Sequence, residues 1–235
     1  MSISKDFNPG ITSPVYFTRK YLLRAFLKHS KYLHGKMLDF GCGSKPYKSL
    51  FTVDEYVGLD YENEGHPHLN EQIDVFYDGE NIPFANEAFD SIFSSEVFEH
   101  VFNLPKSLQE LKRVLKPGGY MLISCPFSIC EHEEPHDFAR YSSFGIKHLL
   151  QAAGFEIIEQ EKTGNAIEAI HQLHVTYIGR HLYPYFKKIP VIRSAFRVIA
   201  FSLINIKGII LSKILPLRKD LYLNNIVVCK KLPSI

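Results

Sequence analysis

The sequence has little excess charge of either sign and no long uninterrupted apolar run. Its 235 residues include 27 lysines and arginines against 25 aspartates and glutamates, a net charge of +2. A dedicated nucleic-acid-binding protein usually has a larger basic excess, so we expect no nucleic-acid partner. No stretch reaches the ~20 uninterrupted apolar residues typical of a membrane-spanning helix. The first twenty residues lack an apolar core, so we expect no signal peptide.

Cysteine is scarce, and its spacing excludes the common cysteine motifs. The four cysteines are Cys42, Cys125, Cys130 and Cys229, and no two of them form a CxxC pair. Neither a zinc site nor a redox motif of that type is therefore indicated. Reduced thiols in a cytoplasmic protein are the simplest interpretation.

The apolar residues that are present alternate between two periodicities. Strand-like segments occur at 37–40, 56–60, 89–94, 120–124, 155–160 and 221–230, and helical spacing occurs at 15–33, 104–115 and 143–153. Strands that alternate with helices favour a parallel sheet covered on both faces. We expect one domain of 1–235, in which 1–34 forms an N-terminal helical segment.

Residues 164–220 interrupt this alternation with a long apolar segment that has helical character. We predict a helical insertion before the last strand, longer than an ordinary connection. It could be a lid, a dimer interface or, through 190–216, a peripheral membrane contact. Arg193, Arg197 and Lys207 project to one side of a helix, but apolar residues share that side. Packing on the sheet or on a second subunit is therefore the simpler interpretation.

A Gly-x-Gly turn follows the first strand-like segment. Gly41 and Gly43 would let a ligand approach the backbone, and Asp60 ends the next strand, where a carboxylate can hold ribose hydroxyls. The third glycine of the dinucleotide fingerprint is missing, because Lys45 and Pro46 stand in its place. We expect Ser44 to cap a following helix with Pro46 in its first turn. A ligand without pyrophosphate fits this turn.

Three further motifs follow in order, namely Asp78-Gly79, the strand 89–95 and the Lys-Pro-Gly-Gly run at 116–119. The ordered set, from about residue 36 to 164, resembles the class I S-adenosylmethionine-dependent methyltransferases. The glycine turn and the 135–141 segment (PHDFARY) resemble bacterial members associated with surface-glycan biosynthesis. The resemblance implies a Rossmann-like, mainly parallel seven-stranded sheet with helices on both faces. Its last strand would be antiparallel.

The resemblance also implies roles for the motif residues. The methionine portion and ribose would be bound by Asp39, Gly41, Cys42 and Gly43, and the ribose hydroxyls by Asp60 with Tyr61 beside the adenine. Asp78 and Gly79 would bind the adenine, and Ser95 would lie near the methionyl amine. Turn capping is the alternative role for Asp39 and Asp78.

A second group of polar residues follows the strand at 89–95. Glu96, Glu99 and His100 would share one face of a helix, where they could hold a divalent cation such as Mg²⁺ or Mn²⁺. This pattern resembles methyltransferases of the ubiquinone pathway and of small RNAs, which use a metal and a later histidine, here matched by His136. Without a metal, His100 or His136 would be the general base. The charged loop 131–134, which includes His132, is interpreted as solvated.

The resemblance implies a methyltransferase, and we expect its acceptor to be a sugar or glycan hydroxyl. Two alternatives stay open at this point. One is a methyltransferase for a quinone-type or other aromatic small molecule. The other is a catalytically silent module that keeps the cofactor pocket.

Overall fold

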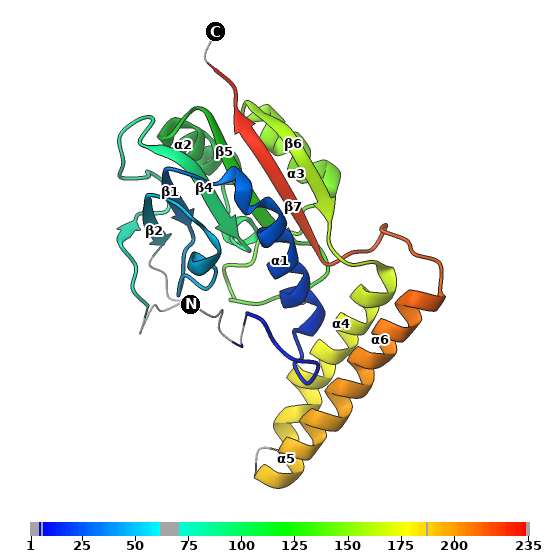
Figure 1. Ribbon diagram of the computed structural model, residues 1–235. Helices are drawn as coiled ribbons and strands as arrows, with labels where there is room; N and C mark the ends of the chain where they lie inside the picture. Colours follow the sequence, from blue (N-terminus) through cyan, green and yellow to red (C-terminus); the bar gives the residue numbers. More distant parts are fainter. Residues whose placement is uncertain (1–4, 6, 62–70, 187, 234–235) are drawn as a thin grey trace.

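The computed structural model describes residues 5, 7–61, 71–186 and 188–233. Within them the chain forms a seven-stranded sheet of order β3-β2-β1-β4-β5-β7-β6 (Figure 1). The strands are β1 (Lys36–Phe40), β2 (Glu55–Tyr61), β3 (Val75–Tyr77), β4 (Phe89–Ser95), β5 (Leu115–Pro126), β6 (Phe155–Lys162) and β7 (Asn224–Lys231).

Strands β1 to β5 pair in parallel, whereas β7 pairs antiparallel with both β5 and β6. The predicted fold class is therefore confirmed, including the antiparallel last strand. Because the parallel strands point the same way, the residues that follow β1, β2 and β4 meet at one edge of the sheet.

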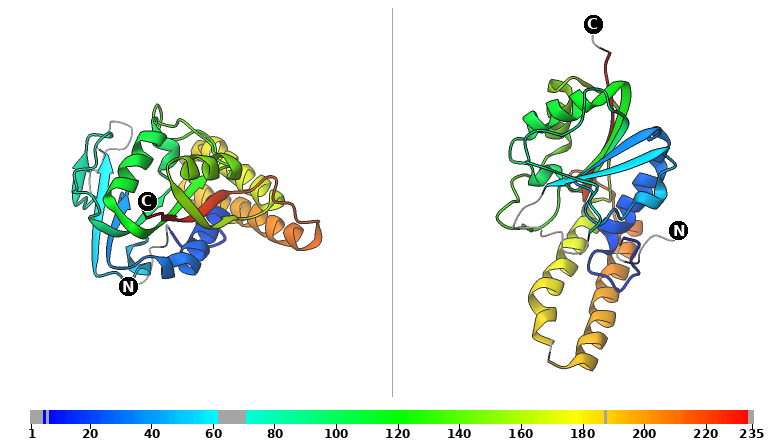
Figure 2. Two further views of the ribbon diagram at one scale, coloured as in Figure 1. Left: turned by 90° about the horizontal axis from the view of Figure 1, so that it is seen from above. Right: turned by 90° about the vertical axis from the view of Figure 1, so that its left-hand side faces the viewer.

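Helices cover the two faces of the sheet, as the views in Figure 2 show. Along β1, Met37 contributes to one apolar cluster and Leu38 to the other, since successive side chains point to opposite faces. The first cluster includes Phe26 of α1 (Tyr16–His29), and the second includes residues of α2 (Leu104–Val114) and α3 (Ser143–Ala152).

Two local expectations were wrong. The helix predicted after the glycine turn does not form, and the only regular element between β1 and β2 is the 3₁₀ turn η2 (Lys48–Leu50). Lys45 has a φ of 54°, outside the helical region, so the chain turns away before a helix can start. Strand β5 begins at Leu115 rather than near residue 120, because Leu115 pairs with Phe89 ahead of a register shift.

The insertion is helical, as predicted, and forms a hairpin. Its elements are α4 (Ala166–Tyr177), η4 (Ile178–Leu182), η5 (Tyr183–Phe186), α5 (Pro190–Phe196), η6 (Arg197–Phe201) and α6 (Ser202–Ile214). Helices α4 and α6 run side by side and project away from the sheet (Figures 1 and 2). We call residues 166–214 the helical hairpin.

The base of the helical hairpin is fastened to the N-terminal part of the chain. The Gln172 side chain accepts from the Phe17 backbone N–H and donates to the Pro14 carbonyl. On the other arm, the Asn205 amide donates to the carbonyls of Ile11 and Ser13. These buried polar contacts fix where the hairpin leaves the domain.

Candidate active site

A cavity of about 790 Å³ lies at the edge of the sheet where β1, β2 and β4 end. All the predicted cofactor residues line it, namely Asp39, Gly41, Cys42, Gly43, Asp60, Tyr61, Asp78, Gly79 and Ser95. Helix α4 adds Gln172, Leu173 and Thr176 to the wall. A cavity of this size and position is typical of a small-molecule site in an open α/β sheet.

The glycine turn is held closely against β2 and the loop after β4. The backbone N–H groups of Gly41 and Cys42 donate to the Leu59 carbonyl at 2.9 and 3.1 Å. Gly41 has a φ of 73°, and a Cβ there would lie 2.3 Å from the Val97 side chain. Glycine is therefore required at position 41 for both conformation and space.

Asp60 links the second strand to the glycine turn. Its carboxylate accepts from the backbone N–H of Gly43 at 2.7 Å and from that of Tyr61 at 2.8 Å. A carboxylate oxygen can accept more than one hydrogen bond. Asp60 thus has the rigid placement that recognition of two neighbouring hydroxyls needs.

Asp39 is buried at the end of β1 and is not a turn cap. Burial raises its pKa to about 7, although the hydrogen bond that it accepts from the Tyr56 hydroxyl acts in the opposite direction. A carboxyl with this pKa changes charge near neutrality. A bound cation next to it would favour the ionised form.

Asp78, in contrast, does cap a turn. Its Oδ1 accepts from the backbone N–H of Asn81 at 2.7 Å and of Glu80 at 2.8 Å, and these bonds lower its pKa. The alternative role considered for Asp78 is therefore realised. The residue still lines the cavity, next to Gly79, whose φ is 80°.

The prediction of a helix over residues 96–100 is wrong. Glu96 has a φ of 58°, which ends β4, and the following residues form the 3₁₀ turn η3 (Phe98–His100). The Glu96 carboxylate points to Ser124 and Asn224, whose side chains donate to it at 2.7 and 2.6 Å. Burial raises its pKa to about 7. Glu96 is thereby engaged by β5 and β7 rather than by the predicted metal site.

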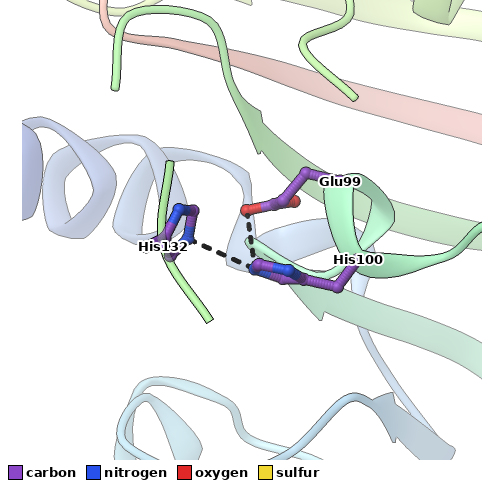
Figure 3. Close-up of side chains that lie close together, drawn as sticks. All are labelled: Glu99, His100 and His132. Carbon is purple, nitrogen blue, oxygen red and sulfur yellow. Dashed lines mark hydrogen bonds and ion pairs between the residues drawn. The ribbon is translucent and has the colours of Figure 1, made fainter. Parts of the chain in front are cut away.

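Glu99, His100 and His132 converge instead (Figure 3). His100 Nε2 lies 3.2 Å from His132 Nε2 and 3.8 Å from a Glu99 carboxylate oxygen. One donor atom from each of the three residues lies within 4.8 Å of the others. The predicted ligand His136 is not one of these three residues, and its backbone carbonyl contacts His100 instead.

The tautomer of His100 follows from its other nitrogen. Nδ1 lies 2.6 Å from the His136 carbonyl oxygen, which can only accept. Nδ1 therefore carries the hydrogen, and the lone pair is on Nε2, toward His132 and Glu99.

Glu99 is completely buried, and neither carboxylate oxygen has a hydrogen-bond partner among the described residues. Burial, together with the nearby Glu96, raises the pKa of Glu99 well above its usual value. A buried polar group without a partner is rare and points to a missing proton, water or ion.

His132 is the site residue that the sequence did not reveal. It is half-buried rather than solvated, and burial lowers its pKa. Its Nδ1 lies 3.3 Å from Asp137, and its backbone N–H donates to the same carboxylate. Burial of Asp137 is outweighed by two hydrogen bonds from Arg140, so its pKa falls to about 2. The sequence signal for this placement of His132 is the spacing of Asp137 and Arg140, which are three residues apart.

A family described as a methyltransferase domain matches residues 15–160, more than half of the chain. The chain belongs to this methyltransferase family. A search of curated proteins found no match.

Solved structures agree with this fold. The cyclase SpnF is 17% identical, with a TM-score of 0.57 over 92% of this chain and 82% of that one. An S-adenosylmethionine-dependent methyltransferase from Mesorhizobium loti is 12% identical, with a TM-score of 0.52 over 96% and 100%. A phosphoethanolamine N-methyltransferase from Haemonchus contortus is 16% identical, with a TM-score of 0.51 over 90% and 53%. At these identities the likeness shows the fold alone.

The methyltransferase family implies S-adenosylmethionine as the methyl donor, and the cavity fits that molecule. The volume of about 790 Å³ is adequate for a nucleoside with an amino-acid chain. The carboxyl of Asp39 and the carboxylate of Asp60 suit a ligand with cationic groups and ribose hydroxyls. The protein is an S-adenosylmethionine-dependent methyltransferase.

Proposed function

We propose that this methyltransferase O-methylates a sugar or glycan hydroxyl. The hydroxyl oxygen attacks the methyl carbon, the bond from that carbon to sulfur breaks, and the hydroxyl proton must leave. A hydroxyl acceptor therefore needs a base or a metal at the acceptor end of the cavity. His100, His132 and His136 line that end.

The observation that carries the proposal is the fixed tautomer of His100. Its Nε2 faces His132 Nε2 at 3.2 Å, so these two nitrogens can hold the proton that leaves the hydroxyl, and the His136 carbonyl holds the His100 ring in position. Carboxyl oxygens of Glu99 and Glu133 lie 3.8 and 3.7 Å from Nε2, where either group in its ionised form would stabilise the imidazolium. His100 is therefore the general base of the proposed reaction, and His132 is its neighbour in the site.

A metal-assisted form of the same reaction has its own support. Both imidazoles have their outer nitrogen against an oxygen acceptor, which is the usual setting of a metal-bound histidine. Glu99 adds a carboxyl group that has no hydrogen-bond partner among the described residues, with an oxygen within 4.8 Å of both imidazoles. Two imidazoles and one carboxylate suit Mn²⁺ better than Mg²⁺, which prefers oxygen ligands. Such an ion would lower the pKa of the acceptor hydroxyl and orient it.

A second acceptor class is favoured by two aromatic rings at the cavity. Phe102 and Phe138 line it with their ring centroids 5.2 Å apart, and both are exposed. Such a wall suits the apolar face of a sugar, but it also suits a quinol or another flat aromatic molecule.

The test is a methyl-transfer assay with the full-length protein over sugar nucleotides, oligosaccharides and quinols. We expect a methylated sugar hydroxyl, and His100→Ala should lower kcat by about 10²–10⁴ with the cofactor affinity unchanged. Methylation of quinols alone would replace the acceptor class. Cofactor binding without transfer to any acceptor would support the silent module.

A further inference from the structure

The helical hairpin has an unusual distribution of charge. Between Glu168 and Asp220 the sequence contains nine lysines and arginines and no aspartate or glutamate. The whole chain has a net charge of +2, so the remainder has a net charge of −7. Seven of these nine cations belong to the helical hairpin, and Arg218 and Lys219 follow it. The positive charge of this protein is thus concentrated in the projecting hairpin and the segment directly after it.

The outer helix of the hairpin exposes a line of large apolar side chains. We call this line the apolar stripe, and it consists of Ile192, Ile199, Leu203, Ile206, Ile210 and Ile214. At helical spacing these residues lie within an arc of about 80°. Leu203 is 63% exposed and Ile214 is 70% exposed. The opposite side, with Phe201 and Ile204, packs against Val175 of α4.

Cations accompany the stripe on the same helix. Lys207 and Lys213 project to its two sides, and Arg193 and Arg197 lie farther round the helix. The side of the helix that carries Arg193, Arg197 and Lys207 lies next to the stripe, so the apolar residues on that side are not those of the stripe. An apolar stripe with flanking lysines is typical of a helix that lies in a membrane interface.

We propose that the helical hairpin docks on an anionic lipid bilayer through the apolar stripe. Residues 190–214 form a continuous helix that is long and apolar enough to cross a membrane. Of its most apolar 18-residue stretch, 22% is buried inside the protein. However, it contains four cations, and one face packs on α4. These features fit a helix that lies along the surface rather than one that crosses.

A second copy of the chain fits the stripe less well. The spacing of the stripe resembles the seam of a coiled coil, but the same helix of a second copy, residues 190–214, would bring four further cations and no acid to pair with them. Like charges at such a seam repel, whereas anionic headgroups attract every lysine and arginine near them. Charge complementarity therefore selects the bilayer.

Docking of the helical hairpin would place the active site close to the surface of the bilayer. Gln172, Thr176 and Arg180 line the cavity from the hairpin, and Arg180 donates to the Glu131 carbonyl beside His132. The same element would hold the protein at the bilayer and form one wall of the cavity. This inference does not rest on the acceptor, since binding to lipid can be measured without turnover.

The test is co-sedimentation of the full-length protein with vesicles of phosphatidylcholine, with or without one-third phosphatidylglycerol. We expect at least about fivefold more protein on the anionic vesicles, with the difference reduced in high salt. The double variant Ile199→Ser/Leu203→Ser should lose this binding, and Lys207→Gln/Lys213→Gln should lower it several-fold. All four side chains are exposed, so circular dichroism and cofactor affinity should match the parent.

Phe144→Ser is the matched control, because Phe144 is 81% exposed but lies on α3, outside the hairpin. It should bind vesicles like the parent. Equal binding of the parent to both vesicle types, or to neither, overturns the proposal. So does a dimer in sedimentation velocity that Ile199→Ser/Leu203→Ser converts to monomer, since the stripe would then belong to a second copy.

Discussion

Asp60 shows how one carboxylate can shape a site and also bind a ligand. It holds the glycine turn through the Gly43 N–H and would accept from the ribose hydroxyls of the cofactor. We predict that Asp60→Ala weakens S-adenosylmethionine binding by about 1.5–3 kcal/mol, the range for a lost charged hydrogen-bond partner. Isothermal titration calorimetry measures this. Glu55→Gln is the control, because Glu55 lies exposed at the other end of β2. Equal affinity of Asp60→Ala and the parent would remove the ribose assignment.

Asp39 should make cofactor binding depend on pH. Its folded pKa of about 7 is above the ordinary value of 3.8, so the free protein holds a proton there in weakly acidic solution. A cationic ligand favours the ionised form, so binding must release that proton. We predict that affinity rises more than about tenfold from pH 5.5 to 7.5.

The same shift has a stability consequence of defined sign. Ionisation of Asp39 is disfavoured in the folded state, so its contribution to stability is greatest below pH ~4 and is lost as pH rises through 7.

The pH dependence of cofactor binding has its own measurement. Calorimetry of cofactor binding in buffers of different ionisation enthalpy detects the proton that Asp39 releases. Asp39→Asn should give the same affinity at both pH values. A pH dependence as steep as that of the parent would assign the effect to another group.

Glu99 and Glu96 form a matched pair of residues for testing the proposed metal site. Glu99 lies in the cluster with two imidazoles, whereas Glu96 is engaged by Ser124 and Asn224. We predict that Glu99→Gln weakens Mn²⁺ binding at least about tenfold and that Glu96→Gln has a much smaller effect. Electron paramagnetic resonance of free Mn²⁺ reports the bound fraction. If the parent binds no Mn²⁺ and chelator leaves turnover unchanged, the metal-free form with His100 as base is the correct one.

At the scale of elements, residues 41–54 between β1 and β2 form no α-helix, and this predicts which nucleotides the glycine turn excludes. A dinucleotide places its pyrophosphate at a helix N-terminus, and here the 3₁₀ turn η2 offers no such terminus at the glycine turn. We predict that millimolar NAD and NADP do not displace S-adenosylmethionine in competition calorimetry. S-adenosylhomocysteine, the demethylated product, should displace it and serves as the positive control. Displacement by either dinucleotide would contradict this account of the turn.

Most elements could be predicted because their periodicity is strong and local. Helix α2 was expected at 104–115 and spans Leu104–Val114, and β4 was expected at 89–94 and spans Phe89–Ser95. Strand β3 was not predicted, since its three residues are too few to show a period. The cofactor residues follow strand ends, so the topology alone brought them together.

The acceptor side could not be predicted in the same way. Its geometry depends on Glu96 adopting a positive φ and on a loop tied by Asp137 and Arg140. Contacts of that kind between side chains and backbone have no sequence period. The sequence therefore could not show that His132, rather than His136, joins Glu99 and His100.

At the scale of the whole molecule, the distal hairpin should be separable from the cofactor site. Tyr183 and Phe201 contact each other with ring centroids 5.7 Å apart, so a short glycine–serine linker can replace residues 184–199. We predict that this trimmed protein binds S-adenosylmethionine within about twofold of the parent, because the cofactor residues lie at the strand ends and in the loops that follow them, outside residues 184–199. Calorimetry provides the measurement.

Removal of the entire hairpin, 166–214, is the informative contrast. It would expose the apolar cluster of Phe17 and Leu223 and leave the Phe17 N–H without Gln172. We expect a lower melting temperature or aggregation from this larger deletion. A large loss of cofactor affinity in the trimmed protein would instead show that the tip supports the cavity.

Strand β7 lies between β5 and β6 in the sheet, although it follows both of them in the sequence. During synthesis the ribosome therefore releases β1 to β6 before β7, the strand that joins β5 to β6. Until Asn224–Lys231 emerges, β5 and β6 each present an unpaired edge, which is a template for association with other chains. A message broken shortly before codon 224 would yield a chain that cannot close its sheet, and the cell would have to remove it.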